Sequence, residues 1–336
     1  MSTHPMLPAL LLAQRRAMQA TRFVSSNMHA ALVKSDTSPV TAADFASQAV
    51  LSLTLSEDDA ARGIPILGEE DADSLARPEN AELRKLVRSA VAFAFERDSM
   101  REHDVLNAIQ DAHSPYATSE ARFFTLDPVD GTKGFLRGGQ YAIALALIED
   151  GTPVLAALGC PHLPPFSLDA TMHSIHVDAV GTLQYAERAW GAFEVDLRDP
   201  TGSPRAIRAR EWKSGSTIRV AESVEAAHSA HDECAKALAL LSCPISSLRL
   251  DSQAKYALVA RGDADLYIRM PTRAGYFECI WDHAAGVLIA QEAGARACDL
   301  NGNALDFSAG ERLFNNLGVL CGDEELITQL LAALRR

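Results

Sequence analysis

The segment 127–132, which reads Asp-Pro-Val-Asp-Gly-Thr, constrains the fold more than any other part of the chain. Pro128 fixes its own φ and pushes Asp127 into an extended conformation. Gly131 then permits a sharp turn behind the second aspartate. Two carboxylates across such a turn can converge on one point, which the Val129 carbonyl can also face. These hard oxygen ligands suit Mg²⁺, although the isolated pattern also fits an Asx-turn with a solvated aspartate.

The composition is that of an acidic globular protein. Of its 336 residues, 48% are hydrophobic and 22% are charged, and 44 Asp and Glu against 31 Lys and Arg give a formal net charge of −13. Such a charge repels nucleic-acid backbones and anionic membranes unless a bound cation reverses the field. No apolar run approaches the roughly 20 residues that a membrane span needs. The acidity therefore favours metal chemistry, or solubility alone, and excludes nucleic acid and membranes as partners.

Two features bear on the compartment. The 6 cysteines form no C-x-x-C pair, and a chain of this size has a core that needs no disulfides, so we expect reduced thiols in the cytoplasm. Residues 1–35 contain no acid but four basic residues, as transit peptides do. Leu7, Leu11 and Leu12 also fit an amphipathic helix that opens a folded domain, and this second interpretation is the one we adopt.

Hydrophobic periodicity and turn residues predict an α+β fold. Helices are predicted over 7–33, from the N-cap Thr41 to Leu55, and over 83–95, 232–241, 252–261, 281–293 and 324–334. Strands are predicted over 64–68, 122–126, 141–148, 153–158, 173–178, 182–187, 193–197 and 217–221. Residues 198–216, rich in Gly, Pro and Ser, are predicted to form a loop. Because the strands cluster in the middle of the chain, we expect layered packing rather than a regular βαβ array, with a boundary near 150–165.

Further acids share the context of Asp127 and Asp130, because each lies at or near the edge of a predicted element. Asp44 opens a helix, Glu69 and Glu70 follow a strand, and Asp282 comes just before a helix. Glu70 also fits a solvated acid within a local acidic run.

Longer motifs surround these acids. Gly68-Glu69-Glu70-Asp71, the segment 126–132 and Trp281-Asp282-His283-Ala284-Ala285-Gly286 together resemble the signatures of the lithium-sensitive, magnesium-dependent phosphatases, the superfamily of inositol monophosphatases and fructose bisphosphatases. Residues 33–44, 131–138 and 250–256 resemble its 3′(2′),5′-bisphosphate nucleotidase branch. The resemblance runs from about residue 7 to the C-terminus and leaves no room for a cleaved transit peptide.

The resemblance implies a layered αβαβα sandwich of the inositol monophosphatase type. In this arrangement an N-terminal α+β lobe, residues 7–160, carries most metal ligands. A C-terminal α/β lobe, residues 161–336, carries the nucleotide-binding residues and Asp282.

The resemblance also implies two or three Mg²⁺ ions, whose ligands are Glu69, Asp127, the carbonyl of Val129, Asp130 and Asp282. Asp127 bridges two of the ions, and Glu70 contacts a third, weaker one. Asp44 and Thr132 orient and deprotonate the attacking water, which attacks in line without a phosphoenzyme.

The residues that the resemblance assigns to the substrate are Thr132, His228, Ser252, Lys255, Arg269 and Asp282. Lysine suits phosphate as a point charge and arginine as a fork. Considered alone, Arg269 also fits a surface salt bridge. His228 and His231 could form a metal pair, but a histidine at a helix entry is the simpler interpretation, and we assign His228 to the nucleotide.

These residues predict a phosphatase that removes the 3′-phosphate of adenosine 3′,5′-bisphosphate and of its sulfated relative. An inositol-phosphate phosphatase with the same metal core is the first alternative, and the segment 252–255 with Arg269 argues against it. A non-catalytic nucleotide sensor is the second, but every implied metal ligand is present. Two departures from the family pattern stand out: residues 111–116 replace a glycine-rich stretch, and Cys279 stands where lysine is frequent. The oligomeric state stays open, and a monomer is expected.

Overall fold

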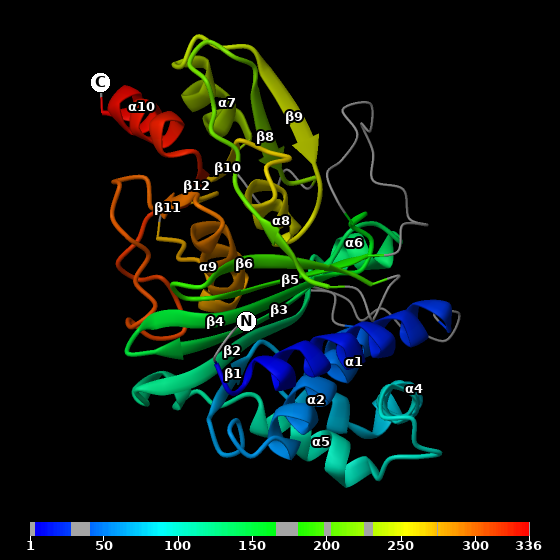
Figure 1. Cartoon of the computed structure of the whole chain (residues 1–336). Coiled ribbons are helices and arrows are strands. Elements are labelled where there is room, and N and C mark those ends of the chain that lie inside the picture. The colour runs from blue at the N-terminus through cyan, green and yellow to red at the C-terminus, as the bar shows by residue number, and fades with distance from the viewer. Residues whose placement is uncertain are drawn as a thin grey trace.

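The structure is a computed structural model that describes residues 4–27, 41–165, 181–197, 203–224, 231–273 and 275–335. Its helices and sheets alternate in layers in the order αβαβα (Figure 1). The predicted α+β sandwich is therefore confirmed. His228 and the strand predicted over 173–178 lie outside the described residues.

The first layer consists of helices from the N-terminal part of the chain. These are α1 (Leu7–Ser26), α2 (Ala42–Glu57), α3 (Asp73–Ala76), α4 (Ala81–Ala94) and α5 (Glu102–Asp111), with 3₁₀ turns at Pro78–Asn80 and Ala117–Ser119. Helix α2 is buried along almost its whole length, since it contacts α1, α4 and α5 as well as the sheet. The Thr41 side chain accepts a hydrogen bond from the Ala43 N–H, and Asp44 closes the predicted capping box.

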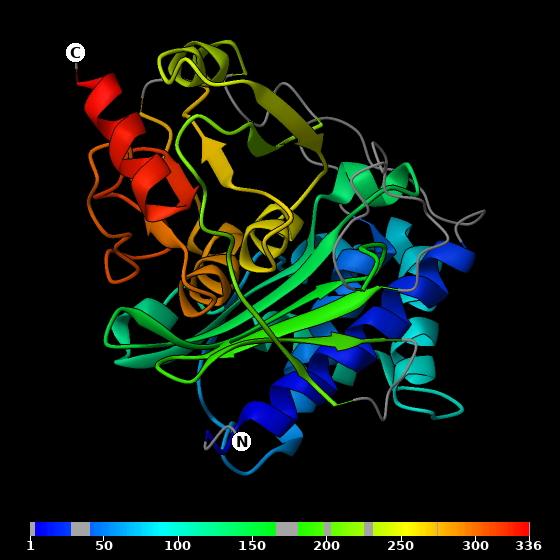
Figure 2. The same cartoon turned by 45° about the horizontal axis from the view of Figure 1, so that its top comes forward.

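A seven-stranded sheet forms the second layer, with the strands in sequence order. They are β1 (Ile66–Gly68), β2 (Arg122–Asp130), β3 (Ala142–Glu149), β4 (Thr152–Cys160), β5 (Thr182–Glu187), β6 (Gly191–Asp196) and β7 (Arg205–Ile207). Strands β1 and β2 are parallel and the other pairs antiparallel. Leu145 and Leu147 of β3 pack on the α1–α2 side, whereas Ala144 and Ala146 face the opposite helices. Both faces are thus covered, and Figure 2 shows the sheet between them.

The remaining layers come from the second half of the chain. Helices α8 (Ala254–Ala260) and α9 (Ala284–Glu292) pack between the two sheets, and the turn η5 (Ile280–Asp282) leads into α9. The second sheet has the order β11-β12-β10-β8-β9. Its strands are β8 (Ile218–Glu222), β9 (Ile245–Arg249), β10 (Leu266–Arg269), β11 (Arg296–Cys298) and β12 (Val319–Gly322). Helices α7 (His231–Ala239) and α10 (Glu324–Leu334) form the outermost layer.

Some predictions need correction. The segment 198–216 is not entirely loop, because Arg205–Ile207 forms the edge strand β7. Helix α1 ends at Ser26, earlier than predicted, and residues 28–40 lie outside the described part. The first sheet continues past residue 160 through β5 to β7, and the division into lobes at this residue stays a prediction. None of the helices in the described ranges is both long and apolar enough to cross a membrane.

The turn that follows β2 depends on Gly131, which has φ +88° and precedes the short helix α6 (Thr132–Leu136). A Cβ atom there lies 3.1 Å from the Ser252 Cβ. We expect Gly131→Ala to lower the free energy of unfolding by about 2–4 kcal/mol, because left-handed strain and overpacking combine. Urea denaturation in EDTA measures this.

Gly138→Ala is the matched control, since Gly138 has φ +69° and open space around its Cβ position. Its substitution adds only the left-handed strain, about 1 kcal/mol. Equal losses in the two variants contradict the close approach of Gly131 to Ser252.

Candidate active site

The end of β2 holds two aspartates in a β-bulge. Asp127 pairs with Ala144 and Asp130 with Ala142, so Pro128 and Val129 both stand opposite one residue of β3. Pro128 cannot donate to the ladder, which makes a bulge the natural place for it. The Val129 N–H donates to Asp127 Oδ1 at 3.1 Å and fixes that carboxylate. The convergence that the sequence predicts for this turn is therefore present.

Asp282 of η5 joins these two aspartates. Ligand oxygens of Asp127, Asp130 and Asp282 all lie within 4.8 Å of one another, close enough to hold one metal ion. Strand β2 ends at Asp130 and η5 begins at Ile280, so tertiary packing brings these distant segments together. The cluster is an acidic site that could hold a metal ion.

Gln253 holds the two halves of this cluster in register. Its backbone N–H donates to Asp130 Oδ2 at 2.7 Å, and its side-chain amide donates to the Trp281 carbonyl at 2.8 Å. The Gly286 N–H donates in turn to Gln253 Oε1 at 3.2 Å. Gln253 is 2% exposed. Its position within the motif 250–256 was the one signal of this role in the sequence, and the sequence analysis missed it.

Glu69 and Glu70 reach the same region from the end of β1. Gln48 of α2 fixes this segment, because the Glu70 N–H donates to Gln48 Oε1 at 3.1 Å. The Glu69 side chain is exposed to solvent yet hydrogen-bonded to Asp127. Enclosure by protein atoms and the charges of Asp282 and Asp44 raise the pKa of Glu69. Glu70 is 8% exposed, which removes the interpretation as a solvated acid.

Asp44 and Thr132 form the pair that the resemblance implied. The Thr132 hydroxyl lies 3.3 Å from Asp44 Oδ1 and 3.2 Å from the Val129 carbonyl, and it can donate to either. Asp44 Oδ2 accepts from the Thr41 N–H at 2.8 Å and from the Thr41 hydroxyl at 2.6 Å. Burial raises the pKa of Asp44 to about 6, although these hydrogen bonds act to lower it. Hydrogen bonds from Thr41 thus hold the Asp44 carboxylate beside Thr132 at the edge of the acidic cluster.

The carboxylates of the acidic cluster repel one another. Burial raises the pKa of Asp127 well above its usual range, and the charges of Glu69 and Asp130 raise it further. Burial also raises the pKa of Asp282 to about 6, although Arg269 opposes the rise. Positive charge placed among such carboxylates lowers their pKa and favours their ionised forms. The donor set, oxygen throughout, fits a hard divalent cation.

The structure brings Ser252, Lys255 and Arg269 to the edge of this cluster, whereas His228 lies outside the described residues. Ser252 has φ +74° and is contiguous with the Gln253 N–H that binds Asp130. Lys255 Nζ donates to the Ser252 carbonyl at 2.7 Å, and burial lowers the pKa of Lys255 to about 8. Arg269 ends β10 and is ion-paired with Glu278.

Glu278 and His283 flank Asp282, and ligand atoms of the three side chains lie within 4.8 Å of one another. Arg269 already balances the charge of Glu278, whose pKa is lowered to about 2 because His283 and Arg269 stabilise the carboxylate against the effect of burial. We therefore assign Glu278 to the arginine rather than to a metal ion. Neither Glu278 nor His283 was singled out in the sequence analysis as a functional residue.

The departures from the family pattern leave the acidic cluster intact. His113 Nδ1 lies 2.8 Å from the Gly68 carbonyl and so braces the end of β1. Cys279 is half-buried beside the cluster, and burial together with the charge of Asp282 raises its pKa. All six cysteines are free thiols.

Comparison with known proteins agrees with this geometry. A 3′(2′),5′-bisphosphate nucleotidase of Schizosaccharomyces pombe is 39% identical over 90% of this chain and 85% of its own length. A 3′(2′),5′-bisphosphate nucleotidase 1 of Candida albicans is 34% identical over 99% and 96%. A 3′,5′-bisphosphate nucleotidase 2 of Arabidopsis thaliana is 36% identical over 90% and 87%.

Solved structures share the fold. The extragenic suppressor protein suhB of Bartonella henselae superposes with a TM-score of 0.64 at 20% identity, covering 99% of both chains. An inositol monophosphatase of Zymomonas mobilis has a TM-score of 0.60 at 17% identity and covers 100% of both. The family model described as the inositol monophosphatase family matches residues 3–336. The chain therefore belongs to the inositol monophosphatase family.

Proposed function

We propose that this chain is a Mg²⁺-dependent phosphatase that hydrolyses the 3′-phosphate of adenosine 3′,5′-bisphosphate, and of its 5′-sulfated relative, to phosphate and the 5′-nucleotide. The observation that carries the proposal is the juxtaposition of two unlike sites. Three carboxylates within 4.8 Å of one another lie on one side, and Lys255 and Arg269 lie beside them. A substrate with a phosphate at each end fits such a pair. The names of the nucleotidase relatives support the same substrate class.

In this proposal Glu69, Asp127, the Val129 carbonyl, Asp130 and Asp282 hold the ions. Magnesium, when bound, supplies the positive charge that offsets the phosphate and stabilises the departing oxygen. The oxygen-only donor set fits this ion, which prefers carboxylates and keeps several waters.

Asp44 and Thr132 handle the proton. The Thr132 hydroxyl donates toward Asp44, so its lone pairs are directed to accept from the attacking water. That water then loses its proton along the path to Asp44, whose raised pKa makes it a better base than an ordinary aspartate. The main-chain and hydroxyl donors of Thr41 keep the receiving carboxylate from rotating.

Thr132→Val tests this path. We expect kcat to fall by about a hundredfold or more while KM changes little, since the hydroxyl serves the water rather than the bound substrate. Steady-state kinetics measure both constants. Thr125→Val is the matched control, because Thr125 is a buried threonine of β2, the strand that leads to Thr132, and its hydroxyl donates to the Leu67 carbonyl. An effect of Thr132→Val confined to KM contradicts the role.

Asp127→Asn separates metal binding from folding. Losing this carboxylate is expected to lower kcat by about a thousandfold, because several kcal/mol of charge stabilisation depend on the ions it holds. The metal-free variant should unfold at the same temperature as the wild type or higher, because a repelling charge is gone. Thermal unfolding in EDTA and in MgCl₂, with turnover at saturating Mg²⁺, provides the measurements.

Asp265→Asn is the control for burial. Asp265 is a buried carboxylate whose neighbours are cations, since Arg219 Nη2 lies 3.0 Å away. Its loss is expected to destabilise the chain by roughly 3 kcal/mol. Stabilisation of metal-free Asp265→Asn, or near wild-type turnover of Asp127→Asn, argues against the assignment of these charges.

The substrate is tested by phosphate release from a panel with and without Mg²⁺. We expect kcat/KM for adenosine 3′,5′-bisphosphate to exceed that for adenosine 3′-monophosphate by about 10- to 150-fold, the value of one charge-assisted contact in a partly desolvated site. Arg269→Ala should erase most of this ratio because it removes the contact to the remote 5′-phosphate. Inositol 1-phosphate as the best substrate makes the chain an inositol-phosphate phosphatase, and the absence of any turnover makes it a sensor.

The compartment and assembly belong to the same proposal. The six free thiols fit a reducing cytoplasm. A monomer is expected, since Asp127, Asp130 and Asp282 already converge within one chain.

A further inference from the structure

Glu278 and Arg269 form an ion pair next to the acidic cluster. Glu278 Oε2 lies 2.6 Å from Arg269 Nη2, and the two side chains are 5% and 17% exposed. Glu278 also lies four residues before Asp282, on the segment that turns into η5. One short stretch of chain therefore carries both a metal-site carboxylate and the partner of the arginine.

Buried groups fix Glu278 from behind. His283 Nε2 lies 3.6 Å from Glu278 Oε2, and His283 Nδ1 is hydrogen-bonded to the Tyr256 hydroxyl at 2.7 Å. Both rings are fully buried between α8 and α9. A fixed, buried histidine therefore lies beside the carboxylate that pairs with the arginine.

Besides Glu278, the Tyr267 hydroxyl also holds Arg269, since the two side chains are hydrogen-bonded. Among the described residues no hydrogen-bond partner lies near its Nε, and Glu278 is the one carboxylate in ion-pair contact with it. An arginine loses considerable rotamer freedom when it is fixed, so fixing it before the ligand arrives removes that cost from binding.

The arginine is held close to the second cation of the site. Tyr267 lies two residues before Arg269 on β10, and Lys255 Nζ is 5.5 Å from the centre of its ring. The Tyr256 ring packs edge-on against the same tyrosine at 4.8 Å. Lys255 and Arg269 thus both lie beside Tyr267, and they are close enough that, besides burial, the charge of Arg269 lowers the pKa of Lys255.

We propose that Glu278 is a positioning residue for recognition of the 5′-phosphate: it holds the Arg269 fork in the orientation that receives the phosphate, without contacting the substrate itself. This inference rests on the proposed function. It adds Glu278 as a residue that determines substrate specificity through its effect on Arg269.

The test is the ratio of kcat/KM for adenosine 3′,5′-bisphosphate to that for adenosine 3′-monophosphate in Glu278→Gln. We expect the ratio to fall by about tenfold, chiefly through KM of the bisphosphate, the size of one charge-assisted contact. Turnover of the 3′-monophosphate should persist, which shows in the same variant that the fold and metal site survive. Calorimetric binding of adenosine 5′-monophosphate in EDTA should weaken by about the same factor.

Two further variants test whether Glu278 acts through Arg269. In the Arg269→Ala background, Glu278→Gln should change the ratio no further, because the residue through which it acts is gone. Glu278→Asp keeps the charge on a shorter side chain and should recover part of the ratio. If Glu278→Gln does not fold, the substrate ratio of Glu278→Asp tests the proposal in its place.

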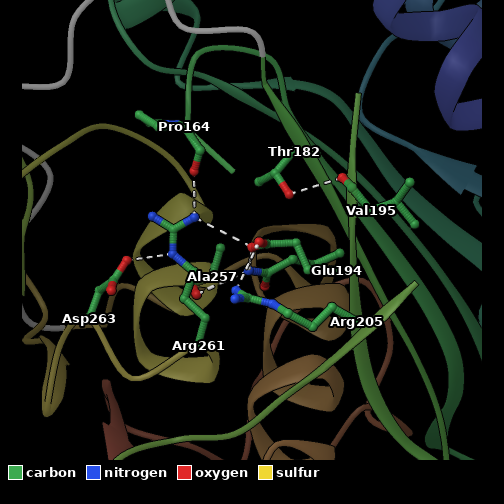
Figure 3. Close-up of polar contacts among 9 residues, drawn as sticks. Pro164, Thr182, Glu194, Val195, Arg205, Ala257, Arg261 and Asp263 are labelled. Atoms are coloured by element: carbon green, nitrogen blue, oxygen red, sulfur yellow. Dashed lines mark hydrogen bonds and ion pairs between the residues drawn. The ribbon is translucent and has the colours of Figure 1, made fainter. Parts of the chain in front are cut away.

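Glu194→Gln is the matched control. Figure 3 shows Glu194 in another buried cluster, where it lies 3.4 Å from Arg261 Nη1 and is joined by Arg205. Arg261 follows the C-terminal end of α8, whereas Lys255 lies in its first turn. Glu194→Gln should lower the unfolding temperature and leave the substrate ratio unchanged.

Several results overturn the inference. An unchanged ratio in Glu278→Gln shows that the arginine needs no partner, and an increased ratio shows that Glu278 competes with the phosphate. Equal losses for both substrates assign Glu278 to stability alone. A wild-type ratio near one overturns the proposed function as well, whereas the other three outcomes leave that function intact.

Discussion

Repulsion among carboxylates that the backbone holds together is the constraint on which the rest of this structure depends. Asp127, Asp130 and Asp282 come within 4.8 Å of one another, and burial with mutual repulsion opposes ionisation of Asp127. Main-chain N–H groups orient two of them, from Val129 to Asp127 and from Gln253 to Asp130. Neutral donors fix the carboxylates without neutralising them. The folding energy of the two sheets thus maintains a cluster of repelling carboxylates that a bound cation would stabilise.

The segments that position the acidic cluster also carry the residues that we assign to the substrate. The Gln253 N–H binds Asp130, and its neighbours Ser252 and Lys255 are the residues that we assign to the substrate. On the other side, one turn carries Glu278 and Asp282. A displacement of either segment therefore moves a metal-site carboxylate and a substrate contact together. In the proposed function, this geometry ties the position of the 5′-phosphate to the position of the bond that breaks.

Features that depend on neighbouring residues could be predicted from the sequence, whereas features that depend on distant partners could not. The turn at Pro128 and the capping box at Thr41 obey local rules, so residue types alone predicted them. Strand β7 was missed because its three residues gain strand geometry only by pairing with β6. Gln253 and Glu278 were missed because their partners lie far away in sequence or on another element. The local sequence around a glutamine or glutamate does not indicate which distant group its side chain will contact.

An acidic chain that binds a polyanion needs its positive charge in the right place. The net charge of −13 repels a nucleotide at long range, so attraction has to arise where solvent screening is weak, inside the site. In the proposed function, hard cations attract one end of the substrate and the Arg269 fork the other. Arg269 also influences Asp282, whose pKa it lowers against the effect of burial. If that arginine paired with the metal-site carboxylates, the ions would lose their ligands. In our proposal, Glu278 pairs with Arg269 and so keeps the two positive sites apart, and this separation distinguishes the two ends of the substrate.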